Sequence, residues 1–303
     1  IASSDNHRAR PGTGYKEIDR FVTTEANGPA SEFVADALYP KEDSQPQSID
    51  LREGELLGLR AGFGAFEAER EASFFSTGGL AAVHSSGRDR DSIWNGLQRK
   101  ETYGTSGDRI LLWFDLISES SDIPMGGTAK TTINPIFKVK AVGAFKQKPG
   151  CPDYSSTNIT DEEIERICKN ECYNPSDERK IITRIEVIKV TPQAFKGEQV
   201  DGLISDPWKV FNCEPNQQGC EVEFSDEEFN SASRDASYYV RAIQEPSPAV
   251  NAGSLRCTYD DEGNCLEVNI CYGDNRTSKD DDCLVMSEER AWSSPIYLNY
   301  YNL

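Results

Sequence analysis

The chain has 303 residues, of which 37% are hydrophobic and 27% are charged, a composition typical of a globular protein with a buried core. Its 51 acidic and 32 basic residues give a formal net charge of −19, which disfavours binding to nucleic acid and to anionic membrane surfaces. The length favours two domains, and no apolar run reaches the roughly 18 residues that a membrane span needs.

The chain begins with a short apolar stretch that leads into two polar residues, Asp5 and His7. In an extended segment, side chains two positions apart point to the same face, so this spacing predicts that both residues bind one metal ion or one substrate. The alternative is that His7 merely ends a strand at the surface. Arg8 and Arg10 follow, and their guanidinium groups are candidates for binding a phosphate or another anion. Solvated loop charges are an equally good interpretation of these two arginines.

A long polar segment, residues 31–50, comes next and is a candidate lid or subunit contact. The second alternative would make the protein an oligomer. Because the chain starts inside an apolar strand, we expect it to be the carboxyl part of a longer protein.

A second apolar run, residues 78–83, also ends in a histidine, His84. We consider His84 a candidate metal ligand or catalytic acid, with a strand end at the surface as the equal alternative. Arg88 follows it and is a candidate for substrate binding, subject to the same alternative as the earlier arginines.

A helix is predicted after this loop. Asp89 or Asp91 can cap its amino end, and Ile93 and Leu97 lie four residues apart on one helical face. Together with the preceding apolar run, the pattern predicts one strand–loop–helix unit of an α/β fold.

From Arg109 onward the sequence predicts short strands in an antiparallel sandwich. One helix interrupts them, because Thr160 and Glu163 form the sequence of a capping box. The predicted strands are residues 110–117, 136–142, 181–190, 220–224, 238–243, 255–259 and 265–270.

All nine cysteines follow residue 150, and six of them flank three short loops, as the pairs Cys213 and Cys220, Cys257 and Cys265, and Cys271 and Cys283. No Cys-x-x-Cys spacing occurs, so these pairs favour local disulfides over zinc. Cys151, Cys168 and Cys172 leave one cysteine that is free or bonded outside the chain. Disulfides indicate a periplasmic or extracellular protein.

The tetrapeptide Ser4-Asp5-Asn6-His7 resembles the last metal-binding motif of the polymerase-and-histidinol-phosphatase (PHP) superfamily of metallohydrolases. Three longer segments, residues 79–83, 99–110 and 290–297, resemble the carboxyl half of a bacterial family of unassigned function attached to that superfamily. The resemblance spans most of the chain.

The resemblance implies that residues 1–108 are the carboxyl-terminal part of a distorted β/α barrel of PHP type. The strand pattern and the cysteines predict that a disulfide-containing, β-sandwich-like domain follows over residues 109–303. The resemblance also implies that Asp5 and His7 bind divalent ions, such as zinc, manganese or iron, which activate a water molecule against a phosphoester. The other ligands would lie in an amino-terminal segment that completes the barrel.

Two functional hypotheses follow. The first is an exported metal-dependent hydrolase, a phosphoesterase acting on an anionic small molecule, with His84 as catalytic residue, Asp5 and His7 as metal ligands, and Arg8, Arg10 and Arg88 as substrate-binding residues. The alternative is a non-catalytic extracellular structural or binding subunit, in which the barrel is a relic and the sandwich contacts a partner or a polymer.

Overall fold

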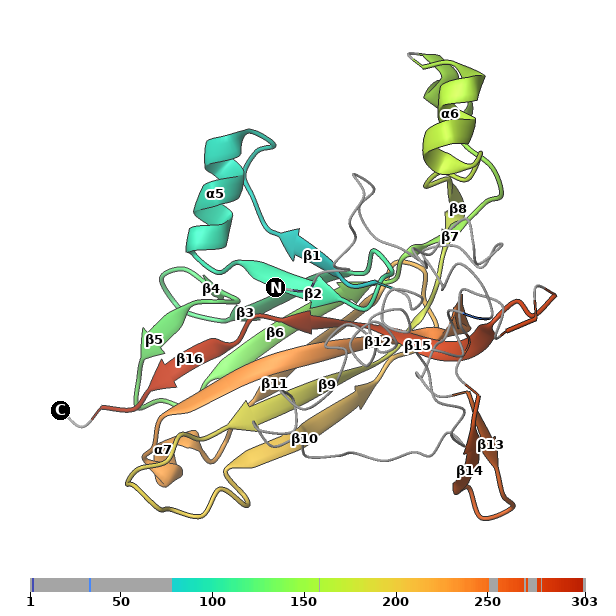
Figure 1. Ribbon diagram of the computed structural model, residues 1–303. Coiled ribbons are helices and arrows are strands. Elements are labelled where there is room, and N and C mark those ends of the chain that lie inside the picture. The colour runs from blue at the N-terminus through green and yellow to red at the C-terminus, as the bar shows by residue number, and fades with distance from the viewer. Residues whose placement is uncertain are drawn as a thin grey trace.

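The computed structural model describes residues 78–301, except 158, 251–255, 270, 272–276 and 279, together with the single residues Ala2 and Phe33. In this part of the chain strands dominate, and most of them belong to two sheets (Figure 1). No helix in the described ranges is long and apolar enough to cross a membrane.

The larger sheet is built around one long strand, β12 (Ala236–Val250). β15 and β16 pair with different halves of one edge of β12, and β9 pairs with the other edge. β10 continues the sheet beyond β9, β2 and β1 continue it beyond β15, and β5 pairs in parallel with β16. The other strands are β1 (Leu80–Val83), β2 (Thr102–Thr105), β5 (Thr128–Lys130), β9 (Ile182–Val190), β10 (Ile204–Asn212), β15 (Leu284–Ser293) and β16 (Ile296–Asn299).

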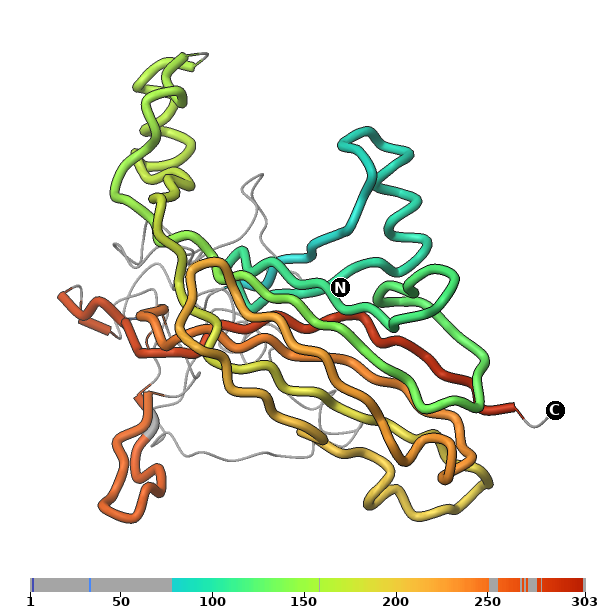
Figure 2. Tube along the Cα trace, turned by 180° about the vertical axis from the view of Figure 1, so that it is seen from behind, coloured from blue at the N-terminus to red at the C-terminus, as the bar shows by residue number. Residues whose placement is uncertain are grey.

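The smaller sheet has four strands in the order β11 (Cys220–Ser225), β6 (Ile136–Val142), β3 (Leu111–Leu116) and β4 (Ile123–Pro124). Exposed and buried residues alternate along β6 from Ile136 to Ala141, and β3 likewise alternates buried with more exposed residues. Since successive side chains of a strand point to opposite faces, one face of this sheet is apolar and buried while the other is open. The long strands of both sheets run side by side along the molecule (Figure 2).

The apolar face of the smaller sheet lies against the larger sheet and forms the core of a β-sandwich. Phe137 of β6 is fully buried at the centre of this core. Its ring centroid lies 5.4 Å from Phe114, 5.2 Å from Phe224 and 4.7 Å from Tyr238, which comes from β12 of the larger sheet. These contacts between aromatic rings join the two layers.

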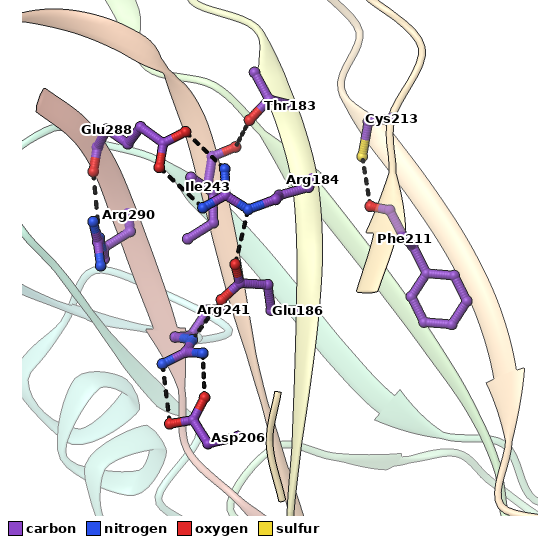
Figure 3. Close-up of polar contacts among 10 residues, drawn as sticks. All are labelled: Thr183, Arg184, Glu186, Asp206, Phe211, Cys213, Arg241, Ile243, Glu288 and Arg290. Atoms are coloured by element: carbon purple, nitrogen blue, oxygen red, sulfur yellow. Dashed lines mark hydrogen bonds and ion pairs between the residues drawn. The ribbon is translucent and has the colours of Figure 1, made fainter. Parts of the chain in front are cut away.

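The opposite face of the larger sheet is also covered at its centre. Ile188 of β9 and Ile243 of β12 point away from the sandwich core, and each is only 1% exposed. The same face carries a chain of partly buried ion pairs that crosses four strands (Figure 3).

Negative and positive side chains alternate along this chain of contacts. Arg184 binds Glu288 of β15 through two contacts of 2.7 and 2.9 Å, and its Nε donates to Glu186 at 2.8 Å. Arg241 of β12 lies 2.8 Å from Glu186 and also binds Asp206 of β10. The adjacent guanidinium of Arg184 lowers the pKa of Glu288. Because each charge has an opposite partner, the charges can be held in a partly buried position.

The helices lie in excursions from the sheets. α5 (Arg90–Gln98) connects β1 and β2 and begins with Asp89, whose side chain accepts a hydrogen bond from the Ser92 backbone. α6 (Asp161–Cys168) has the predicted capping box of Thr160 and Glu163. It projects from the sandwich beyond β7 (Phe145–Gln147) and β8 (Pro175–Arg179), with a 3-10 helix at Asp153–Thr157 (Figure 1). A short helix, α7 (Phe229–Ala232), precedes β12, and β13 (Cys257–Tyr259) and β14 (Cys265–Val268) form a hairpin.

Four pairs of cysteines lie at disulfide distance, and the three pairs predicted from loop-flanking spacing are confirmed. Cys151 pairs with Cys172 across the α6 excursion, which leaves Cys168 as the free cysteine. Several disulfides are consistent with a protein that folds in an oxidising compartment.

The predicted β/α barrel is wrong. A strand, β1, precedes the helix α5, as predicted, but β1 pairs antiparallel with the strand that follows the helix, β2, with Leu80 opposite Thr105. A barrel unit needs parallel strands joined by a crossover helix that covers the sheet. Here β2 pairs antiparallel with β15 as well. The described ranges contain no closed barrel, neither intact nor as a relic, and strands from both sides of residue 108 share one sheet. The division into two domains at that residue stays a prediction.

Replacing the central core aromatic, Phe137→Ala, is expected to lower the free energy of unfolding by about 3–5 kcal/mol, because it removes a buried ring and leaves a cavity. Chemical denaturation followed by circular dichroism measures this change. Ile136→Ala is the matched control, since Ile136 is 44% exposed on the other face of the same strand. Equal losses for both variants would contradict the sandwich core described here.

Candidate functional site

Most of the predicted site residues lie outside the described part of the chain. Asp5, His7, Arg8 and Arg10 are in this group, and so is the candidate lid at residues 31–50 apart from Phe33. Ala2 is described and lies against β2, because a Cβ at Gly104 would come within 2.9 Å of the Ala2 Cβ. Glycine at position 104 permits this close approach.

His84 lies directly after β1 and is half-buried. Its Nε2 lies 2.8 Å from the backbone oxygen of Leu112 in β3. A carbonyl oxygen only accepts hydrogen bonds, so Nε2 carries the proton and donates it. The ring centroid of His84 is 5.5 Å from that of Tyr103 and 5.9 Å from that of Trp113, which places the histidine at the edge of the smaller sheet.

Arg88 lies exposed in the loop before α5. A hollow of about 300 Å³ lies on the open face of the smaller sheet next to His84, and Arg88 is not among the residues that line it. The structure therefore connects His84, through Trp113, with residues that were not predicted as site residues: Trp113, Asp115, Lys138, Lys140 and Glu221.

Strand register explains why these side chains come together. Trp113 of β3 lies opposite Lys140 of β6, which lies opposite Glu221 of β11. One row along, Asp115, Lys138 and Glu223 occupy the same three strands in the same order. The alternation within residues 110–117 and 136–142 is the sequence signal that could have identified this shared face.

Opposite charges are paired across the hollow. The Lys138 Nζ lies 2.7 Å from the Glu221 Oε1, and this contact lowers the pKa of Glu221 and raises the pKa of Lys138. Partial burial raises the pKa of Asp115, and the nearby negative charge of Asp122 raises it further. The hollow thus offers both hydrogen-bond donors and acceptors to a ligand.

Trp113 provides the apolar part of this site. Its side chain is 36% exposed although it lies in the middle of a short strand between buried neighbours. The Lys140 Nζ lies 5.9 Å from the centroid of its ring, within the range of a cation–π contact. The Lys140 ammonium and the His84 ring both lie near the indole, which still presents part of its ring to solvent.

A second group of titratable residues is buried where the β2–β3 loop meets β12 and β15. The Lys180 Nζ binds the Asp108 carboxylate at 2.8 Å and the Ser247 hydroxyl at 3.0 Å, and the Gln244 side chain also donates to Asp108. Glu289 of β15 is 5% exposed and accepts a hydrogen bond from Ser106. Burial raises the pKa of Glu289, and the negative charge of Asp108 raises it further.

One group of described residues could hold a metal ion. Cys271, Asp281 and Cys283 each offer a ligand atom, and these atoms lie within 4.8 Å of one another. The two cysteines are also the fourth disulfide pair, and Asp281 accepts hydrogen bonds from Arg256 and from the Cys283 backbone. Thiolates, rather than a disulfide, would be needed for this group to bind a metal.

The buried Glu289 predicts a distinct dependence of stability on pH. Its pKa is raised in the folded state, so the stability associated with its protonated form is complete below the ordinary pKa of the carboxyl group and is lost as the pH rises through the raised value. Glu289→Gln removes this loss, worth about 1.4 kcal/mol for each unit by which the pKa is raised. The free energy of unfolding of the variant, relative to the wild type, is therefore expected to increase from about pH 4 to pH 8, as measured by urea denaturation.

Glu288→Gln is the control, because Arg184 lowers the pKa of this neighbouring carboxylate. Its contribution is present above the ordinary pKa and is lost as the pH falls through the lowered value, so the pH trend is opposite in sign. Parallel curves for the wild type and Glu289→Gln would show that Glu289 titrates normally.

Comparisons with known proteins give a family match over the amino-terminal part of the chain. Residues 1–115 match the sequence profile of a family described as "Protein of unknown function (DUF3604)". The match ends inside β3 and includes His84, Trp113 and Asp115. No curated protein and no solved structure matches the chain, and a relationship to the PHP superfamily stays a prediction. The first 115 residues of this chain are thus similar to a family to which no function is assigned.

Proposed function

We propose that the β-sandwich is a non-catalytic binding module of an exported protein and that the open face of its smaller sheet binds a polysaccharide. The observation that carries this proposal is the exposed indole of Trp113 in a hollow lined by paired charged side chains. Four cysteine pairs support export to the periplasm or the extracellular space.

An aromatic side chain and polar groups have complementary roles in such a site. The apolar face of a sugar ring can stack on an exposed indole, which contributes a large contact area at a low cost in conformational entropy. The carboxylates and ammonium groups beside Trp113 can accept and donate hydrogen bonds to hydroxyl groups. The site lies on the open face of a sheet, and an open face can accommodate a chain that extends beyond it in both directions.

The arrangement of the polar groups favours binding over bond cleavage. Lys138 is paired with Glu221, and the proton on Nε2 of His84 is donated to the Leu112 carbonyl. In this position His84 supports the ring of Trp113 from one side.

Trp113→Ala is expected to weaken binding to a retained polysaccharide about ten-fold or more, because the stacking surface is lost. Affinity electrophoresis through gels containing neutral, acidic and basic polysaccharides measures this effect. Trp94→Ala is the matched control, since Trp94 is 57% exposed on α5, away from the hollow. Equal retention of Trp113→Ala and the wild type in every gel would contradict the proposal, provided that circular dichroism shows both folded.

A metal-dependent hydrolase, of phosphoesterase type, is the second candidate function. It is supported by the alternation of Asp5 and His7 in the sequence and by the contact of Ala2 with β2, the strand that pairs with β1 just before His84. Asp5 and His7 would hold a divalent metal ion, which supplies a Lewis acid for phosphoester hydrolysis. Arg8, Arg10 and Arg88 would bind the anionic substrate.

Asp5→Ala and His7→Ala are expected to remove most of the bound zinc, manganese or iron from the full-length protein, as measured by elemental analysis of the purified variants. Phosphoesterase activity should fall with the metal content. Asp261→Ala is the control, because Asp261 is an exposed acidic residue in the turn between β13 and β14. Unchanged metal content together with unchanged phosphoesterase activity would rule out this second function.

A further inference from the structure

The lysines of the proposed binding face are surrounded by carboxylates. Lys138 lies in register between Asp115 and Glu223, and its ammonium group is also paired with Glu221. Lys140 lies in register between Trp113 and Glu221. Both lysines belong to β6, the strand that lies between β3 and β11, so positive charge runs along the middle of the face and negative charge along its sides.

This pattern opposes ligands of either sign. Four carboxylates, those of Asp115, Asp122, Glu221 and Glu223, surround the two ammonium groups, so the face carries a negative excess in a chain that is itself strongly acidic. A polyanion would be repelled by this excess and would have to separate Lys138 from Glu221. A polycation is attracted by this excess, but Lys138 and Lys140 already occupy the positions between the carboxylates that its own charges would need.

We infer that the ligand of this face is a neutral polysaccharide, a chain of uncharged pyranose rings, rather than an acidic or a basic one. The inference rests on the proposed function and names the class of ligand for the same site. An uncharged sugar keeps the ion pair between Lys138 and Glu221 intact, and its hydroxyl groups can donate to the carboxylates and accept from the ammonium groups.

Stacking on Trp113 then supplies the main contact. Lys140 and His84 hold the indole in place before the ligand arrives. The Lys140 Nζ lies 5.9 Å from the centroid of the Trp113 ring, and the centroid of the His84 ring lies 5.9 Å from it as well. A preorganised aromatic ring loses little freedom on binding, which favours affinity without any net charge on the ligand.

The experiment is affinity electrophoresis of the whole chain with four soluble probes: hydroxyethylcellulose and galactomannan as neutral chains, alginate as a polyanion, and chitosan as a polycation. The expected result is retention by at least one neutral chain, with a retardation that changes less than about two-fold when salt is raised from about 0.05 to 1 M. Trp113→Ala should abolish this retention, while Trp94→Ala should keep it.

A charge-reversed variant, Glu221→Lys with Glu223→Lys, makes the test sharper. Both positions are exposed on β11, so the variant should fold. It turns the negative excess of the face positive, and it is therefore expected to gain salt-sensitive retention by alginate that the wild type lacks.

The outcomes separate this inference from the proposed function. Retention by alginate or chitosan alone, lost in Trp113→Ala, would overturn the neutral ligand and leave the binding module standing. Retention that Trp113→Ala does not change, or no retention by any of the four probes, would overturn both.

Discussion

The alternation of side chains along β3 and β6 is the constraint on which the rest of the structure depends. Leu112 and Phe114 point into the sandwich, so Trp113 and Asp115 must point to the open face of the same sheet. A shift of one residue in the register would exchange the two sets and place Trp113 in the core. The contacts between aromatic rings that join the two layers therefore also hold the binding face in position.

The larger sheet obeys the same constraint under different conditions. On β9, Ile185 and Val187 face the core, whereas Arg184 and Glu186 lie on the face that is also covered at its centre. Charged residues persist there because each one has a partner on a neighbouring strand. The two sheets thus differ on the face that points away from the core. In the larger sheet this face carries ion pairs and buried isoleucines, whereas in the smaller sheet it is open and carries Trp113.

Much of the fold could be predicted from local patterns. The predicted strand at residues 136–142 has the bounds of β6, the alternation of residues 185–190 identifies β9, the capping box identifies α6, and loop-flanking cysteines identify three disulfides. β10 escaped prediction because Pro207 interrupts its pattern, which an edge strand tolerates at the point where its register with β9 shifts.

The errors arose where local patterns do not determine long-range pairing. A strand, a helix and a strand follow each other in residues 80–105, but the antiparallel pairing of β1 with β2 and the pairing of β2 with β15 exclude a barrel. The site was missed for a related reason. Histidines and clustered acids are visible in the sequence, whereas Trp113 and Lys138 become neighbours of Glu221 only through the register of β3, β6 and β11, of which β11 is distant in the chain.

His84 illustrates how the structure changes an interpretation. In the sequence it was a candidate ligand or catalytic acid at a strand end, and in the fold its Nε2 donates to the Leu112 carbonyl while its ring contacts Trp113. The contact joins the end of β1 to β3, and both residues lie within the segment that matches the family of unknown function.

The most direct measurement of the central claim is a crystal structure of this chain with a neutral oligosaccharide, such as cellohexaose or mannohexaose. The account predicts a sugar ring stacked on the exposed part of Trp113, with hydroxyl groups hydrogen-bonded to residues of β6 and β11 and the ion pair between Lys138 and Glu221 preserved. An oligosaccharide bound elsewhere on the chain, with the face around Trp113 occupied only by solvent, would contradict it.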